Sequence, residues 1–213
     1  MSLQASAALR RIAPVALAAA IIAAPASAAT AGCAPAGAKV LASSGAARLY
    51  SSANALYGCV GKRRSLLGSL TGTHAAPATR VARYVLAGDY AGIDTVQMGV
   101  DNLAATLTLV DLQTGATLAH SPATTGPPEA ESFSTVTALA VNSNGILAWI
   151  GKRSAVGHPT AEYELFIATR THTSANASAT VPLTHLQLTN KTLSYTLGPN
   201  GKRFTIPLAD PTH

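Results

Sequence analysis

Three glycine-led pairs of basic residues are the most chemically suggestive groups in this chain of 213 residues. They are Lys62-Arg63, Lys152-Arg153 and Lys202-Arg203, and each follows alternating apolar residues that read as a strand. We therefore expect each pair to form a turn. Equivalent turns of successive repeats emerge on one side of an array, so these cations would form one rim that binds a polyanion. The alternative is that Gly-Lys-Arg is simply a soluble turn.

The two cysteines, Cys33 and Cys59, are the second group with potential chemistry. In an exported chain, an even pair forms a disulfide more often than it stays as two thiols. That bond requires Cα atoms within about 7 Å of each other, and it would hold the N-terminal segment onto the first repeat. Neither cysteine has a second Cys or a His at ligand spacing, so a zinc site has no support.

Two groups of acidic residues have spacings compatible with chemistry. Asp89, Asp94 and Asp101 are close in sequence and could offer oxygen ligands to a cation, although turn formation explains Asp89 and Asp101 more simply. Glu162 and Glu164 are two apart on an expected strand and so share one of its faces. Two exposed acids on an outer strand are a simpler interpretation than an acid/base pair, and we predict no metal site.

No catalytic or cofactor motif is present in the sequence. There is no Gly-x-Ser-x-Gly elbow, His-Glu-x-x-His zinc helix, phosphate-binding glycine loop or Asp-rich calcium loop. The sixth histidine, His213, is the last residue of the sequence, and we interpret the other five as solvated or structural side chains: His74, His120, His158, His172 and His185. We therefore assign no catalytic residue, no metal ligand and no cofactor.

The first residues have the pattern of a secretory signal. Arg10 and Arg11 precede an apolar stretch over 12–24, and Ala26-Ser27-Ala28 matches the small-x-small cleavage pattern. We predict that residues 1–28 are removed and that 29–213 form a secreted or otherwise extracytoplasmic protein without a transmembrane segment. A membrane anchor is one alternative, although the apolar stretch is shorter than the ~20 residues of a span. A lipoprotein attached through Cys33, which follows Ala31-Gly32, is another.

The predicted mature chain has 185 residues (213 minus 28), enough for one domain with a sizeable core. Its charge would be 13 basic minus 9 acidic residues, or +4, because the signal contains two arginines and no acid. Such a charge favours solubility and weak attraction to anionic surfaces. Aromatic residues are only 5% of the chain, which argues against a sugar-stacking cleft and against nucleic-acid binding by base stacking.

The elements that would position these groups are short strands in a repeated pattern. Val136–Arg153 and Thr184–Arg203 both place alternating apolar residues on either side of an Asn-containing turn, so that Trp149 matches Tyr195. A period of roughly 40 to 50 residues built from short strands is typical of stacked sheets such as propeller blades. Further strands are expected within the segments 46–70, 81–96, 105–121, 162–169 and 171–180.

This pattern predicts an all-β fold, a small β-propeller or propeller-like array of about four blades. The last repeat has only three expected strands, and Lys39–Ser44 is a spare strand near the N-terminus. Propellers often close by letting one terminus complete the blade built by the other, so a closed four-bladed propeller with Lys39–Ser44 in the last blade is the favoured architecture. An open array of about four blades that forms a homodimer and a twisted sandwich are the alternatives.

Three segments resemble known proteins: Thr106–Pro122, Ile146–Gly151 and Leu186–Arg203. The first is similar to a blade hairpin of YVTN-type propeller repeats, and together they resemble secreted β-propeller-like proteins of actinobacteria with YVTN- and WD40-like blades. The resemblance implies an exported scaffold and supplies no catalytic residue. We expect a non-enzymatic protein that binds a protein or an anionic cell-envelope polymer through one loop face. The alternative is a secreted hydrolase or lyase with its site in the central funnel.

Overall fold

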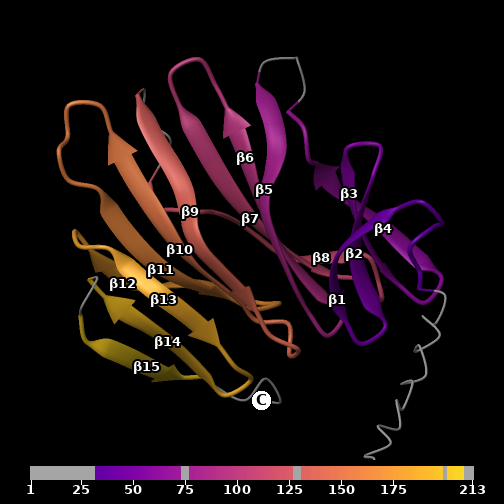
Figure 1. Ribbon diagram of the computed structural model, residues 1–213. Coiled ribbons are helices and arrows are strands. Elements are labelled where there is room, and N and C mark those ends of the chain that lie inside the picture. Colours follow the sequence, from indigo (N-terminus) through magenta and orange to yellow (C-terminus); the bar gives the residue numbers. More distant parts are fainter. Residues whose placement is uncertain (1–31, 73–76, 127–130, 199–200, 209–213) are drawn as a thin grey trace, which may run out of the picture. The chain divides into compact units, whose positions relative to one another are not determined.

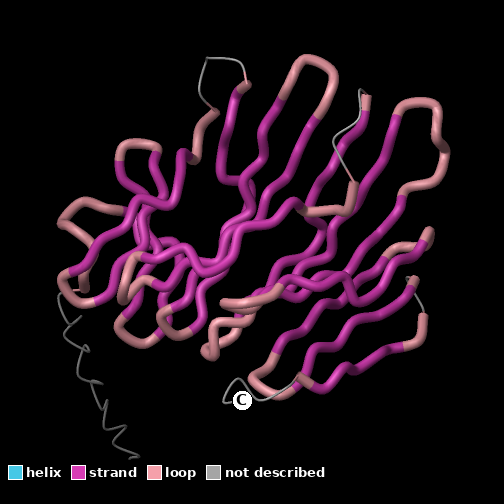
Figure 2. Tube along the Cα trace, turned by 180° about the vertical axis from the view of Figure 1, so that it is seen from behind, coloured by secondary structure: helices cyan, strands magenta, loops and turns pink. Residues whose placement is uncertain are grey.

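All the secondary structure that the computed structural model describes is β-strand (Figure 1, Figure 2). The described residues are 32–72, 77–126, 131–198 and 201–208, within the unit Ala31–His213. They contain fifteen strands and no helix, and so no helix that could span a membrane. The predicted all-β class is confirmed. The predicted signal, 1–28, and two of the histidines, His74 and His213, lie outside the described residues.

The described strands form four consecutive antiparallel meanders, which we call the first to the fourth. The first contains β1 (Lys39–Ser44), β2 (Ala47–Ser52), β3 (Ala55–Val60) and β4 (Arg63–Ser69). The second contains β5 (Ala78–Ala87), β6 (Tyr90–Met98), β7 (Leu103–Asp111) and β8 (Ala116–Pro122). The third contains β9 (Ser132–Val141), β10 (Leu147–Ala155), β11 (Glu162–Ala168) and β12 (Thr173–Ala179). The fourth contains β13 (Leu183–Leu188), β14 (Thr192–Leu197) and β15 (Arg203–Pro207).

Each meander pairs its strands in chain order. The first and fourth meanders are separate sheets, whereas a single parallel pair, Leu103 with Phe133, joins the second and third into one eight-stranded sheet. Tight turns make this order possible. Gly45 and Gly88 adopt the left-handed φ values of 53° and 55° that the first turns of their meanders require, which a residue with a Cβ seldom adopts.

The first turns of the four meanders lie at one end of the strands. The Ser44 hydroxyl accepts a hydrogen bond of 2.7 Å from the Gly88 N–H, and a Cβ placed on Gly88 would lie 3.3 Å from the Cβ of Ser143. Ser143 in turn exchanges hydrogen bonds with the side chain of Asn190. We call this end the turn end. The loops after the second strands and the links between meanders then lie at the opposite end, which we call the link end.

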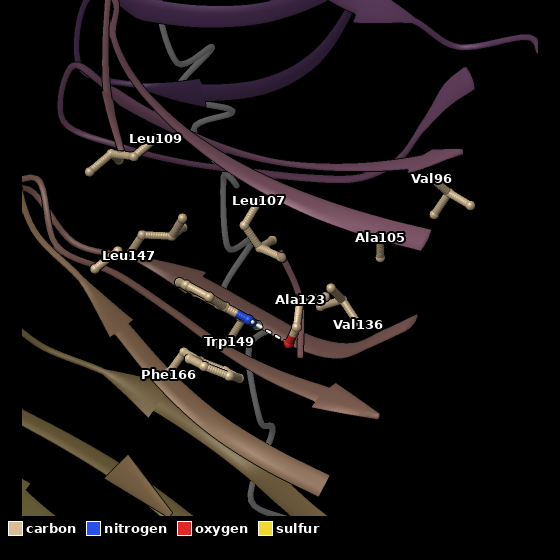
Figure 3. Packing of buried hydrophobic residues seen from close by; sticks show 10 residues of the cluster. Val96, Ala105, Leu107, Leu109, Ala123, Val136, Leu147, Trp149 and Phe166 are labelled. Atoms are coloured by element: carbon tan, nitrogen blue, oxygen red, sulfur yellow. Dashed lines mark hydrogen bonds between the residues drawn. The ribbon is translucent and has the colours of Figure 1, made fainter. Parts of the chain in front are cut away.

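Three apolar clusters fill the spaces between successive meanders. Leu49, Leu56 and Ile93 are among the residues between the first and second, and Ile150, Leu165 and Leu193 are among those between the third and fourth. The cluster between the second and third is the one in Figure 3, with these residues: Val96, Ala105, Leu107, Leu109, Ala123, Val136, Leu147, Trp149, Phe166 and Ala168. The described sheets are therefore held together by burial of both faces of the inner strands.

The fourth meander has three strands, as the sequence indicated, but Lys39–Ser44 does not complete it. Lys39–Ser44 is β1, which pairs with β2 and lies beside β5 just as β5 lies beside β9. The predicted closure through this strand is therefore wrong, because β1 is the first strand of its own meander. The described strands form an open series of sheets and no closed propeller.

Candidate functional site

The three predicted basic turns do not meet on one rim. Arg63 begins β4 and donates a hydrogen bond to the Thr114 carbonyl in the β7–β8 turn, at the turn end. Arg153 lies in β10 and donates a 3.3 Å hydrogen bond to the Thr125 carbonyl, just beyond the opposite end of β8. The length of β8, seven residues or ~20 Å, separates the two arginines.

Only two of the three pairs lie in loops or at strand starts. Lys62 and Lys202 are in turns, whereas Lys152 and Arg153 are inside β10, so the prediction of a turn at that pair is wrong. The strand continues because both residues pair with β9 and β11 on either side. Arg203 begins β15 and donates hydrogen bonds of 2.5 Å to Gln187 and 2.8 Å to Ser194.

The start of the link between the second and third meanders, 123–126, is fixed by contacts with Trp149, Glu164 and Gly151. The Trp149 indole N–H donates a 3.0 Å hydrogen bond to the Ala123 carbonyl (Figure 3). Glu164 accepts hydrogen bonds from the backbone N–H of Thr125, at 2.6 Å, and from the hydroxyl of Thr125. Because Gly151 has no side chain, the link can lie directly against β10. A Cβ at this position would be 1.9 Å from the Ala123 carbonyl oxygen.

Glu162 and Glu164 point to the same face of β11, as their spacing predicted, but they have different partners. Glu162 accepts a 2.5 Å hydrogen bond from Arg153 in a partly exposed ion pair. Glu164 is 7% exposed and holds the link, and β11 is the third strand of its meander, with β12 outside it. The prediction of two exposed acids on an outer strand is therefore wrong.

Among the described residues, three adjoining hollows lie at the link end, around the start of β9. The first, of about 220 Å³, is lined mainly by polar side chains: Ser132, Arg153, Ser154, Ala155, His158, Thr160 and Glu162. The second, of about 200 Å³, shares Ser132 and Arg153 with it and extends to Thr106 and Thr124. The third, of about 430 Å³, is lined by the β6–β7 turn together with Glu131, Phe133 and Val156. We call these three hollows the link-end site.

Exposed apolar side chains surround the third hollow. Val100 is 94% exposed, Val156 is 61% exposed and Phe133 is 38% exposed. Asp101 and Glu131 stand among them. The link-end site therefore combines exposed apolar side chains with positively and negatively charged ones. This composition is more typical of an interaction surface than of a solvated loop.

The three aspartates considered as cation ligands are separated. Asp89 is in the β5–β6 turn and Asp101 is in the β6–β7 turn, at opposite ends of the nine-residue strand β6. Asp94 is inside β6 and 1% exposed. No cluster of His, Cys, Asp or Glu within the described ranges could hold a metal ion.

Asp94 is the most perturbed acid that the structure describes. Burial raises its pKa to about 6, while the charges of Arg83 and Arg80 oppose that rise. Arg83 Nε is 4.0 Å from Oδ2 of Asp94, and Oδ1 has no hydrogen-bond partner. Asp94 shares its face of β6 with Val96, which packs between the second and third meanders, so the carboxylate lies in an apolar interface and not in a hollow.

The histidines are spread over the described residues. His158 is the only one of them that lines the link-end site, and it is exposed. His120 forms a 3.1 Å hydrogen bond with Thr108, and His185 forms one of 3.0 Å with Thr184. His172 is exposed in the β11–β12 turn. The interpretation of these four as solvated or structural side chains stays a prediction.

The predicted disulfide is present. Cys33 and Cys59 are bonded, with their Cα atoms 5.7 Å apart. Cys59 is in β3 and fully buried, and the Arg64 Nε–H donates a 3.1 Å hydrogen bond to the Cys33 carbonyl. The bond therefore fixes the segment before β1 onto the first meander.

Sequence reasoning did not identify the link-end site. Its apolar side chains occupy turns, where Val100 follows Gly99 and Val156 precedes Gly157. A valine beside a turn glycine is a usable signal, because such a position offers no interior for the side chain. Comparison with family models and with curated proteins finds no match for this chain.

Proposed function

We propose that this protein is an exported, non-enzymatic scaffold that binds a protein or an anionic cell-envelope polymer through its link-end site. The single observation that carries the proposal is the link-end site, where exposed Val100, Val156 and Phe133 stand beside a polar hollow containing Arg153. Loops on a rigid sheet scaffold are the usual place for binding residues.

The composition of the site supports macromolecular binding. Contiguous exposed apolar side chains with a polar surround are typical of interaction surfaces, and arginine and aromatic residues contribute much of the affinity there. The ion pair between Arg153 and Glu162 lies at the margin of the apolar area. It would contribute more to the orientation of a bound partner than to the affinity.

The disulfide supports a location outside the cytoplasm. Bonds such as Cys33–Cys59 persist in oxidising compartments, and the signal pattern of residues 1–28 gives the same expectation. The bond also uses the Cys33 sulfur to which a lipid anchor would have to be attached, so we favour a soluble exported protein over a lipoprotein.

Binding to defined envelope material is the test. Purified mature protein is mixed with sacculi carrying or lacking their anionic polymers, and the bound fraction is measured by co-sedimentation. The Val100→Ser, Val156→Ser double variant should lose most of the binding, whereas Val181→Ser, which removes another exposed valine from the β12–β13 link, should bind like the parent. Equal binding by the double variant and the parent would exclude the link-end site.

The same experiment addresses the enzymatic alternative. The described sheets do not close around a funnel, so an enzyme would have to use another cavity, such as the first hollow with His158, Ser132 and Glu162. Release of soluble fragments from the sacculi over time, abolished by His158→Ala, would replace the scaffold proposal with an enzymatic one.

A further inference from the structure

The third hollow of the link-end site is formed by two segments that are far apart in the sequence. In the β6–β7 turn, the Gly99 N–H donates a 3.0 Å hydrogen bond to the Asn102 carbonyl, so residues 100–101 form the tip of a tight turn. On the other side, the Val156 N–H donates a 3.1 Å hydrogen bond to the carbonyl of Glu131, just before β9. Both segments line the hollow of about 430 Å³, and backbone hydrogen bonds fix them.

The hollow has an apolar lining. Met98 and Leu103 line it and also pack against the apolar cluster between the second and third meanders. Around them are Val100, Val156 and Phe133, which are 94%, 61% and 38% exposed. An apolar side chain that entered the hollow would cover part of these three side chains and so remove apolar surface from water.

The hollow is also acidic. Its lining includes two acidic residues, Asp101 and Glu131, and no basic one. Both are exposed, and neither forms an ion pair with a basic side chain in the described part of the chain. In the adjoining first hollow, Arg153 and Glu162 neutralise each other, so the acidic charge stays in surplus. A partner that complements this surface therefore carries positive charge.

Turn geometry does not explain the carboxylate at position 131. Glu131 adopts a left-handed φ of 61°, a conformation that glycine and asparagine adopt with less strain. Residues held in such conformations concentrate at functional sites. A binding role for the charge of Glu131 is therefore a better explanation than the turn itself.

Two other occupants fit this surface less well. An anionic envelope polymer or an anionic lipid surface would be repelled by Asp101 and Glu131. A metal ion would find only two carboxylates in the lining, and the described residues contain no group of three potential ligands. Positive charge and apolar side chains are combined in a protein segment.

We propose that the third hollow docks a protein segment in which basic and apolar side chains are neighbours. An apolar side chain of the segment packs against Phe133 and Val156, and a basic side chain pairs with Asp101 or Glu131. This inference rests on the proposed function, and it narrows the partner of the link-end site to a basic protein segment.

Three hexapeptides with blocked termini test the chemistry of the occupant. The first alternates lysine with leucine, the second has glutamate in place of lysine, and the third has serine in place of leucine. Binding of each labelled peptide to the mature, oxidised protein is measured by fluorescence anisotropy at low and high salt. The parent should bind the lysine–leucine peptide about tenfold more tightly than either of the others, because each of those lacks one kind of contact. High salt should reduce the preference over the glutamate peptide.

Two double variants separate the charged contact from the apolar one. Asp101→Asn, Glu131→Gln should bind the lysine–leucine and glutamate–leucine peptides equally well. Val100→Ser, Val156→Ser should lose most of the preference for the lysine–leucine peptide over the lysine–serine peptide.

Two matched controls remove the same kinds of group elsewhere. Asp89→Asn changes an acid at the turn end, where the carboxylate accepts a hydrogen bond from Gln113. Val181→Ser changes an exposed valine in the β12–β13 link. Both controls should keep both peptide preferences of the parent.

The inference and the proposed function fail in different ways. The inference is overturned if the parent binds the lysine–leucine and glutamate–leucine peptides equally, or if the double acidic variant keeps the preference. Either result leaves the proposed function in place when Val100→Ser, Val156→Ser still loses binding to sacculi. If that variant binds sacculi like the parent while the peptide preferences hold, the proposed function fails and the docking of a basic segment stands. Association of the parent in light scattering that the double acidic variant abolishes would assign the hollow to a second copy of the chain instead.

Discussion

Two buried carboxylates lie between the second and third meanders, and their surroundings are opposite. At the link end, Glu164 is 7% exposed and receives two hydrogen bonds from Thr125. In the middle of the interface, Asp94 is 1% exposed, has one oxygen without a partner, and is 4.0 Å from Arg83. The difference shows that burial alone does not decide whether a carboxylate stabilises a sheet interface. The number of hydrogen-bond donors that reach the carboxylate also matters.

The largest expected effect comes from removing the link that brings Thr125 to Glu164. Gly151→Ala would place a Cβ 1.9 Å from the Ala123 carbonyl oxygen, which is backbone and cannot swing aside. We expect the free energy of unfolding to fall by about 3 to 4 kcal/mol, measured by urea denaturation. Gly72→Ala is the control, because a Cβ there meets only ordinary contacts at 3.8 Å, and it should change stability by less than about 0.5 kcal/mol. Equal losses of stability in Gly151→Ala and Gly72→Ala would contradict the interpretation that Gly151 makes room for the link.

Asp94→Asn should stabilise the protein at neutral pH. The pKa of Asp94 is raised to about 6 in the folded protein, above 3.8, so keeping it ionised opposes folding. We expect the variant to be more stable than the parent by about 2 to 3 kcal/mol at pH 7.5 in urea denaturation. Asp101→Asn, in an exposed turn, should match the parent.

The difference in stability between Asp94→Asn and the parent should depend on pH in one direction. Between pH 4 and 6 the folded protein binds more protons at Asp94 than the unfolded chain does, so the parent gains stability as the pH falls through about 6. The advantage of Asp94→Asn should therefore be largest above pH 7 and nearly absent at pH 4. An advantage that stays constant over this range would show that the charge of Asp94 is not its source.

Glu164→Gln tests the satisfied carboxylate. The amide of Gln can accept from the Thr125 N–H and donate to the Thr125 hydroxyl, but the charge that strengthens both hydrogen bonds of the carboxylate is lost. We expect a loss of about 1 to 2 kcal/mol in unfolding free energy, opposite in sign to the effect at Asp94. A gain in stability would remove the contrast between the two sites.

Glu162→Gln should have the smallest effect. Its ion pair with Arg153 is partly exposed, with side chains 47% and 35% accessible, and pairs of this kind contribute little. We expect a change below about 0.5 kcal/mol by the same urea measurement. A change as large as that of Glu164→Gln would mean that Arg153 has a structural role at the link end.

Much of the fold was predictable because the strands alternate apolar and polar residues between clear turn signals. The match of Trp149 with Tyr195 places equivalent residues on β10 and β14. The three-strand final meander was also predictable. Lys152-Arg153 was not, because a strand with neighbours on both sides continues through a basic pair that would otherwise suit a turn.

The candidate site was mostly beyond sequence reasoning. The burial of Glu164 depends on the link over Gly151, a contact between segments 28 residues apart that no local pattern encodes. Asp94 was grouped with Asp89 and Asp101 because they are close in sequence. The length of β6 separates Asp89 from Asp101, and Asp94 is buried against the third meander. Only the disulfide pairing could be predicted directly, because the chain contains two cysteines.

The consecutive order of the meanders has a consequence for how the protein folds. Each sheet pairs only strands that are adjacent in the chain, except for the single contact between Leu103 and Phe133. Strand pairing therefore requires only short loop closures, and the slow events are the docking of finished sheets. Because synthesis proceeds from the N-terminus, the first sheet can be complete before the last one has been made. Each sheet then serves as the surface on which the next one assembles.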